Sequence, residues 1–277
     1  MNFCKRAVVY LLAITAIVCF NTGLIDQIQQ VAKITHLLDE ENTEGLLRQQ
    51  QISPELYQEF EKYTKDSEFS QYDYLVAHLL TEHTQKNELE DYLTLLYQYH
   101  SQEIRNMVKS ELSIWKDLQY FPVPLSKSSP GMDTSFENSW MFDRNFGGNR
   151  GHEGTDIMAS ENQRGRYPVI SITDGVVEKI GWLELGGYRI GIRSPSGGYF
   201  YYAHLYDYAR EFEIGDEIQA GELLGFMGDS GYGPEGTVGK FAVHLHVGIY
   251  VDNEKGEELS FNPYWILKWL EPKRLSY

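Results

Sequence analysis

The stretch KFAVHLHVGIY, from Lys240 to Tyr250, alternates between apolar and mixed side chains along its whole length. Successive residues of a β-strand point to opposite faces, so the alternation predicts a strand with one apolar face turned toward a core. The other face carries His244 and His246, about 6.6 Å apart at a rise of ~3.3 Å per residue. Such a pair belongs either to a solvated sheet face or to a metal site. The predicted apolar face consists of Phe241, Val243, Leu245, Val247 and Ile249.

Short strands separated by glycine turns are expected throughout the sequence after Asp133. Two strands should flank Asp174–Gly175, and a hairpin should close near Ser196–Gly198. Further turns are expected at Gly215–Asp216 and Ala220–Gly221. Many short strands at this spacing indicate an antiparallel sandwich or barrel.

Apolar residues at three- and four-residue spacing predict helices between residues 26 and 118. Ser53 is expected to cap one of these helices, with Pro54 in its first position. A segment with three prolines and a serine cluster, Tyr120 to Asp133, then ends the helical pattern. We interpret the histidines of the helical region as solvent-facing or satisfied core residues: His36, His78, His83 and His100.

The N-terminus resembles a secretion signal, because Lys5 and Arg6 precede the apolar residues 7–20 and the apolar character extends to Ile25. A stretch of this length comes close to the roughly 20 residues that span a bilayer. Large side chains stand where a cleavage site would need small ones, which favours an uncleaved signal anchor over a cleaved signal. The body of the protein is then expected outside the cytoplasmic membrane, either anchored through this single segment or secreted to the cell wall.

The predicted fold class is therefore α+β. Residues 1–25 are expected to form the signal anchor or signal peptide, and residues 26–118 a helical domain or stalk. Residues 119–277 are expected to form an all-β catalytic domain of antiparallel sandwich or barrel type.

Composition limits the chemistry of the protein. The net charge of −16 argues against binding to nucleic acid or to an anionic lipid surface, because neither polyanion attracts an acidic protein. The cysteines, Cys4 and Cys19, both lie in the first twenty residues. Any metal in the C-terminal part must therefore be held by histidine, aspartate or glutamate side chains.

The remaining four histidines all lie in the β-rich part, and one of them, His152, stands four residues before Asp156. Zinc binds imidazole nitrogen and carboxylate oxygen, and a catalytic zinc site keeps three protein ligands and one open position. Strand geometry suggests that only one of His244 and His246 binds a metal directly while the other stands beside it. The fourth histidine, His204, lies on a strand between the two motifs. The β-rich part contains more histidines than a zinc ion would take as ligands, and this surplus favours a catalytic site over a structural one.

The segments HEGTD, YYAHL and HLH resemble the three signature segments of the M23, or lysostaphin-type, zinc metallopeptidases. The intervening DGVV and GDEIQAGELLGFMGDSG are similar to the strand and turn pattern of that family, and the resemblance extends from about Arg144 to Pro263. HEGTDIMA, GGYRIGIR and GYGPEGTVGKF resemble the sporulation-type L-alanyl-D-glutamate endopeptidases within the family.

The resemblance implies an M23-like fold and one Zn²⁺ per chain, held by His152, Asp156 and His246. It also implies that His204 and His244 are the catalytic histidines, one as general base and the other as stabiliser of the oxyanion. The implied function is zinc-dependent hydrolysis of peptide bonds in the stem peptides or cross-links of peptidoglycan, with L-Ala–D-Glu as a candidate bond.

A tyrosine precedes the first ligand in some members of the family, whereas this sequence has Phe146 at the nearby position. Alternation in YFYYAHL places Phe200, Tyr202 and His204 on one face of a strand. Tyr202 is therefore the candidate for supplying the missing hydroxyl group, although packing is the commoner role of a strand tyrosine.

Three other functions are compatible with parts of the sequence. A catalytically silent, membrane-tethered scaffold or activator of cell-wall hydrolases could share the fold, but such proteins usually lose ligands and here all five positions are filled. A phosphohistidine carrier would leave Asp156 without a task and an exported chain without a phosphate donor. A lipoyl-type carrier needs a modifiable lysine that IGDEIQAGE lacks.

Overall fold

The computed structural model describes residues 40–127, 132–144 and 148–277, together with scattered positions between Thr15 and Leu38. The predicted signal or anchor segment, residues 1–25, lies outside the described residues apart from six scattered positions. Among the described residues, no helix is both long and apolar enough to cross a membrane.

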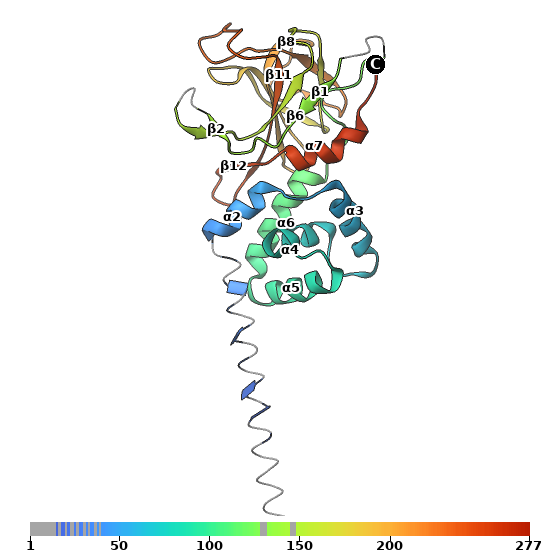
Figure 1. Cartoon of the computed structure of the whole chain (residues 1–277), viewed down its shortest axis with the longest axis vertical. Helices are drawn as coiled ribbons and strands as arrows, with labels where there is room; N and C mark the ends of the chain where they lie inside the picture. Colours follow the sequence, from blue (N-terminus) through green and yellow to red (C-terminus); the bar gives the residue numbers. More distant parts are fainter. Residues whose placement is uncertain are drawn as a thin grey trace, which may run out of the picture.

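Helices fill the first part of the described chain, and a short helix follows the last strand (Figure 1). Ser53 caps the second labelled helix as predicted, because its side chain accepts a hydrogen bond from the backbone N–H of Leu56 and Pro54 opens the helix. Ser70 and Asp73 form a reciprocal capping box at the start of the next helix. The α-helices are α2 (Glu40–Gln49), α3 (Pro54–Tyr63), α4 (Gln71–Thr81), α5 (Lys86–Tyr99), α6 (Ser101–Trp115) and α7 (Tyr264–Leu270).

The strands confirm the predicted antiparallel β architecture, since every strand pair is antiparallel. Ten strands form one sheet with the main order β1-β4-β11-β8-β7-β6-β9, and β2 pairs with β3 separately. The strands are β1 (Thr134–Phe136), β2 (Asp143–Arg144), β3 (Arg150–Gly151), β4 (Thr155–Ala159), β5 (Pro168–Ile170), β6 (Gly175–Leu183), β7 (Gly187–Arg193), β8 (Tyr199–Tyr208), β9 (Glu217–Ile218), β10 (Leu223–Met227), β11 (His244–Asp252) and β12 (Glu258–Phe261).

The strand predicted from residue 240 onward begins later, at His244. Leu245, Val247 and Ile249 are fully buried, as the alternation predicted. The placement of Phe241 on the same core face is wrong. Phe241 precedes the strand and lines a cleft, where its ring centre is 4.6 Å from that of His204. Alternation assigns a face only where the backbone is a strand, and the backbone before His244 is a loop.

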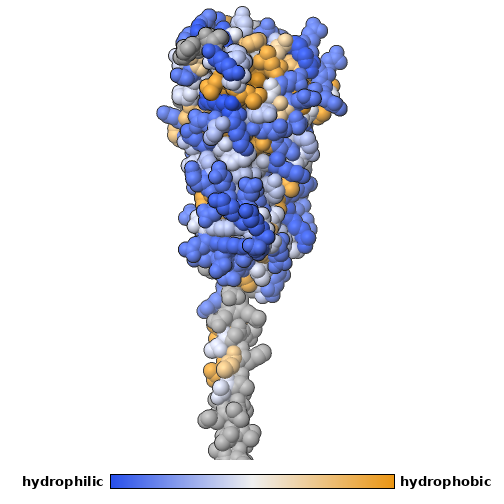
Figure 2. All heavy atoms as spheres, turned by 90° about the vertical axis from the view of Figure 1, so that its right-hand side faces the viewer, coloured by the Kyte–Doolittle hydropathy of each residue, from blue (hydrophilic) through white to orange (hydrophobic). Residues whose placement is uncertain are grey.

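The helical part packs directly on the β part through the end of α6. The Ser113 hydroxyl donates to the Ser196 carbonyl over 2.7 Å, and the Asp117 carboxylate accepts from the Ser196 backbone N–H over 2.7 Å. One continuous cluster of buried apolar side chains includes Trp115 of α6 and Ile249 of β11. On the face shown in Figure 2 the helical part is mostly hydrophilic, whereas hydrophobic residues gather on the β part. Whether residues 26–118 and 119–277 are separate domains stays a prediction.

Candidate metal and catalytic site

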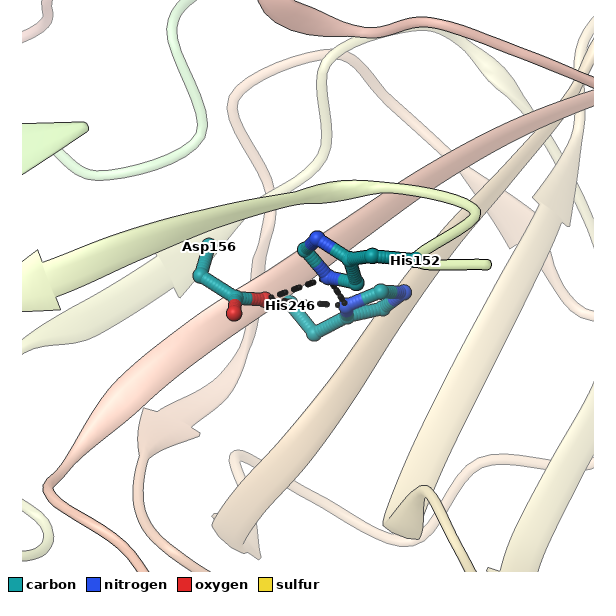
Figure 3. Close-up of side chains that lie close together, drawn as sticks. All are labelled: His152, Asp156 and His246. Carbon is teal, nitrogen blue, oxygen red and sulfur yellow. Dashed lines mark hydrogen bonds and ion pairs between the residues drawn. The ribbon is translucent and has the colours of Figure 1, made fainter. Parts of the chain in front are cut away.

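Two neighbouring strands bring the first ligand candidates together. His246 of β11 lies directly opposite Asp156 of β4, so both side chains project from the same face of the sheet. His152 precedes β4 and follows β3, which carries its ring back over the other two (Figure 3). On the other side of β11, His246 lies opposite Ala203 of β8.

Three side-chain atoms of this group converge on a single point. His152 Nε2 is 3.0 Å from Asp156 Oδ1 and 3.1 Å from His246 Nδ1, and the last two atoms are 3.0 Å apart. A tetrahedral zinc ion with bonds of about 2.0–2.1 Å keeps its ligand atoms roughly 3.3 Å apart. The triangle therefore matches one face of a zinc site. Among the described residues it is the one group of three or more such side chains close enough to hold an ion.

Further contacts orient these ligand candidates. His152 Nδ1 lies 3.0 Å from the Ser139 hydroxyl and 3.2 Å from the Ser139 carbonyl oxygen. A donated Nδ1–H bond to that carbonyl leaves the lone pair of Nε2 directed at the group's centre. Arg144 donates to the second carboxylate oxygen of Asp156 over 2.6 Å, so Oδ1 stays available. Polar partners of this kind typically surround metal ligands, and two imidazoles with one carboxylate suit zinc.

The space beside His246 exists because residue 154 is a glycine. A Cβ atom added to Gly154 would lie 2.4 Å from His246 Cε1 and 2.7 Å from the Val247 carbonyl oxygen. No other residue type leaves room for the ring in its present position. The glycine between His152 and Asp156 is thus part of what holds the ligand group together.

His204 and His244 lie beside the ligand candidates, with ring centres 4.7 Å apart. His204 Nδ1 contacts the Ser230 carbonyl oxygen over 2.8 Å, and His244 Nδ1 contacts the Ala242 carbonyl oxygen over 2.8 Å. A carbonyl only accepts, so each Nδ1 carries the proton and each Nε2 is left with a lone pair in the neutral ring. His244 Nε2 is 3.7 Å from Asp156 Oδ1. These two histidines therefore present proton-accepting nitrogens next to the ligand group.

Burial and neighbouring charges shift the pKa values of His204, His246 and Asp156. Burial lowers the pKa of His204 well below its ordinary value, and the neighbouring His244 and His246 lower it further. Burial likewise lowers the pKa of His246. For Asp156, burial raises the pKa, but hydrogen bonds from His152 and His246 outweigh that effect and keep its pKa well below the usual range. At neutral pH the group thus combines an ionised carboxylate with a neutral His204.

The placement of Tyr202 on the same face as His204 is wrong. Tyr202 is fully buried, and its hydroxyl accepts a hydrogen bond from the Ile172 backbone N–H over 2.8 Å. The strand carries a bulge where His204 adopts a left-handed backbone with φ of 62°, and this bulge moves His204 to the opposite face. Tyr201 lines the cleft instead, with its ring centre 6.0 Å from that of His246. Phe146 lies outside the described residues.

A cleft of about 510 Å³ contains the whole group and several residues that the sequence reasoning missed. Four cationic side chains line it although the chain as a whole is acidic. Tyr201 lies beside His246, and Tyr250 lies beside Tyr201, so both add aromatic surface. Each of the missed residues stands alone in its segment, so no sequence pattern indicated it. The missed residues are Arg144, Arg150, Lys179, Arg189, Tyr201 and Tyr250.

An antiparallel β-sheet with this ligand group and two adjoining histidines is the architecture of a metallopeptidase. Residues 150–259 match the model of peptidase family M23, and this range includes all five of the predicted site residues. Over 144 residues the chain is 46% identical to an L-Ala–D-Glu endopeptidase of Bacillus subtilis (strain 168), covering 52% of this chain and 41% of that protein. It is 32% identical over 102 residues to the glycyl-glycine endopeptidase ALE-1 of Staphylococcus capitis, covering 36% of this chain and 24% of that protein.

A crystal structure from Ruminococcus gnavus ATCC 29149 shares nearly the whole fold. That protein, provisionally named the glycyl-glycine endopeptidase lytM, is 44% identical, with a TM-score of 0.71. The match covers 88% of this chain and 97% of that one. The chain therefore belongs to peptidase family M23, and the resemblance predicted from its motifs is confirmed. The matches span less than half of the length of the curated relatives named above.

Proposed function

We propose that this protein is a zinc-dependent endopeptidase that hydrolyses peptide bonds in peptidoglycan peptides, with L-Ala–D-Glu as the bond cleaved. His152, Asp156 and His246 would hold the ion. The observation that carries the proposal is the triangle of ligand atoms 3.0–3.1 Å apart, with two further histidines beside it. The bond is chosen because the 46% identical relative is named for it.

When bound, zinc acidifies water and polarises the carbonyl group of a peptide bond. His204 and His244 provide the proton transfer and the stabilisation of the oxyanion. One of them accepts a proton from the attacking water at Nε2 and passes it to the amide nitrogen as the C–N bond breaks. The other, once protonated, donates a hydrogen bond to the oxyanion that forms on the carbonyl oxygen. The carbonyl partners at Ser230 and Ala242 keep both rings turned for these roles.

We also propose that the enzyme works outside the cytoplasmic membrane, tethered by residues 1–25 or secreted, with residues 26–118 as a helical domain or stalk and 119–277 as the peptidase domain. Support comes from the paired cations Lys5 and Arg6 before an apolar stretch. Externally added protease should digest the C-terminal part in intact cells without their wall. Protection until the membrane is lysed would contradict this location.

The hydrolysis itself is tested with purified zinc-loaded protein and peptidoglycan peptides. New N-terminal D-Glu and C-terminal L-Ala groups should appear by mass spectrometry, and a chelator should stop their formation until zinc is restored. A silent scaffold need bind no zinc and releases no peptide. The proposal would be contradicted if the purified protein bound no zinc, or if the zinc-loaded protein never released new amino groups.

A further inference from the structure

Two arginines in the cleft lack the partners that such side chains normally have. The Nε and Nη1 atoms of Arg189 and the Nε atom of Arg150 are buried and make no hydrogen bond to the described residues. The guanidinium group is always charged and offers five donors. Leaving buried charged donors unpaired is costly, so such groups usually have an explanation beyond packing.

The other two cations of the cleft are already paired with carboxylates. Arg144 contacts Asp156, and Lys179 contacts Glu258 over 3.1 Å. Among the described residues, no carboxylate lies within ion-pair distance of Arg189. The cleft thus holds positive charge that none of the described residues neutralises, within a chain of net charge −16.

Strand order places Arg189 close to the ligand group. Asp156, His246 and Ala203 are successive partners across β4, β11 and β8. In β7, Tyr188 pairs with Leu205 of β8 and Ile190 pairs with Tyr202. Arg189 lies between these two residues, so it stands opposite the bulge at His204. With strands about 4.8 Å apart, its backbone is roughly 10 Å from that of His246. That separation corresponds to about three residues of an extended peptide.

Tyr201 lies in the same part of the cleft. Arg150, Arg189 and Tyr201 all line this cleft. The ring centre of Tyr201 is 6.0 Å from that of His246. The Tyr208 hydroxyl donates to the Arg189 carbonyl oxygen over 2.9 Å, which fixes the backbone from which the guanidinium extends.

We propose that Arg189, assisted by Arg150, binds a free carboxylate of the substrate next to the bond that is cleaved, and so selects acidic peptides. This inference rests on the proposed function. Glutamate joined through either of its carboxyl groups keeps the other one free, so an L-Ala–D-Glu bond has a carboxylate beside it unless that group is amidated. The planar guanidinium matches a planar carboxylate and binds it more strongly than a neutral group.

The test compares two synthetic peptides that differ only at this group, one with the free carboxylate of D-Glu and one with that carboxylate amidated. Wild-type protein should prefer the acidic peptide by roughly 10- to 100-fold in kcat/KM. Arg189→Gln should lose that preference through KM, while its activity on the amidated peptide stays within about 3-fold of wild type. Arg189→Lys should keep part of the preference.

Arg105→Gln, which removes a cation from the exposed face of α6, is the matched control and should change nothing. Zinc content and melting temperature are measured for each variant. Equal kcat/KM of wild type for both peptides, or an equal loss on both peptides in Arg189→Gln with zinc retained, would overturn the inference. If neither peptide is hydrolysed, the proposed function fails instead. Calorimetric binding of the two peptides to zinc-loaded wild type and Arg189→Gln then decides the role of Arg189.

Discussion

At the scale of single residues, the five histidine and aspartate side chains of the cleft fall into two sets with different surroundings. His152, Asp156 and His246 share one point in space, whereas His204 and His244 are tied to backbone carbonyls beside it. The two sets should therefore respond differently to mutation.

His152→Ala and Asp156→Ala should lose zinc and activity together, because each removes an atom of the converging triangle. His204→Ala and His244→Ala should keep most of the zinc and lose turnover by roughly 10²–10⁴-fold, the usual loss for acid–base groups. Metal analysis and hydrolysis rates on the same preparations check this. If His244→Ala were to empty the site while His246→Ala did not, the assignment of those two residues would be reversed.

Gly154→Ala should damage the ligand group without touching a ligand. The added Cβ atom would overlap the His246 ring and the Val247 backbone, so the ring must move. Displacements of about 1 Å near the reacting atoms cost roughly 10²-fold in rate. We expect a loss of that order in kcat/KM and weaker zinc binding, measured by competition with a chelator.

Gly45→Ala is the matched control, because nothing lies within 4 Å of the added Cβ atom on α2. An alanine there should leave activity unchanged and stabilise the helix by up to about 1 kcal/mol. Wild-type zinc affinity in Gly154→Ala would show that the close approach of Gly154 does not hold His246.

At the scale of elements, α6 carries an acidic residue into the core. Glu111 is fully buried and accepts a hydrogen bond of 2.7 Å from Gln50, whose own oxygen accepts from the Trp115 indole N–H. Its second carboxylate oxygen has no partner among the described residues. Burial raises the pKa of Glu111 from 4.5 to about 8, so the folded protein holds this group protonated at neutral pH.

Glu111→Gln should stabilise the protein as the pH rises. Between pH 4.5 and about 8 the unfolded state has lost this proton while the folded state keeps it, so the stability of the wild type falls with pH in that window. The neutral isostere removes this loss, and its advantage should reach several kcal/mol near pH 8 and vanish near pH 4. Urea unfolding at a series of pH values measures it.

Glu103→Gln on the exposed side of the same helix should leave the pH dependence as in wild type. If Glu111→Gln gave a curve parallel to that of wild type between pH 4.5 and 8, Glu111 would have to be ionised in the folded protein.

At the scale of the whole molecule, the helical and β parts share one apolar cluster, and α6 is hydrogen-bonded to the hairpin of β7 and β8. Burial of apolar surface across such a junction couples the unfolding of the two parts. Calorimetry should therefore show one thermal transition. Two well-separated transitions with independent midpoints would indicate two domains that fold alone.

Zinc should stabilise the folded protein. A ligand that binds only the folded state adds RT ln(1 + [L]/Kd), about 4 kcal/mol at a thousandfold excess over Kd. Chelation should lower the melting temperature of wild type, and re-addition of zinc should restore it. His152→Ala should melt at the same temperature with and without zinc, and an equal shift in that variant would place the stabilising ion elsewhere.

Much of the β architecture was predictable because it depends on residues that are close together in the sequence. Alternation in Leu245, Val247 and Ile249 marks a buried strand face, and the glycine turns mark where strands end. The Ser53 cap followed by Pro54 is a local signal of the same kind, and it was correctly placed. The M23 motifs could be recognised for a similar reason, since each is a short run of adjacent residues.

What local sequence could not determine depends on contacts between distant segments. The bulge at His204 turns this histidine to the face of Tyr201 and away from that of Tyr202, and it lies where the pairing of β8 with β7 is irregular. Phe241 enters the cleft because the strand begins three residues later, at His244.

The sequence by itself determined the strand pattern, the helix starts and the residue types able to hold a metal, because these depend on neighbours along the chain. Only the tertiary structure decided that a histidine, an aspartate and a second histidine meet within 3.1 Å. It also decided that two arginines share their cleft, with buried nitrogen atoms that have no partner among the described residues. Convergence and pairing are properties of segments brought together by folding, and no spacing along one chain specifies them.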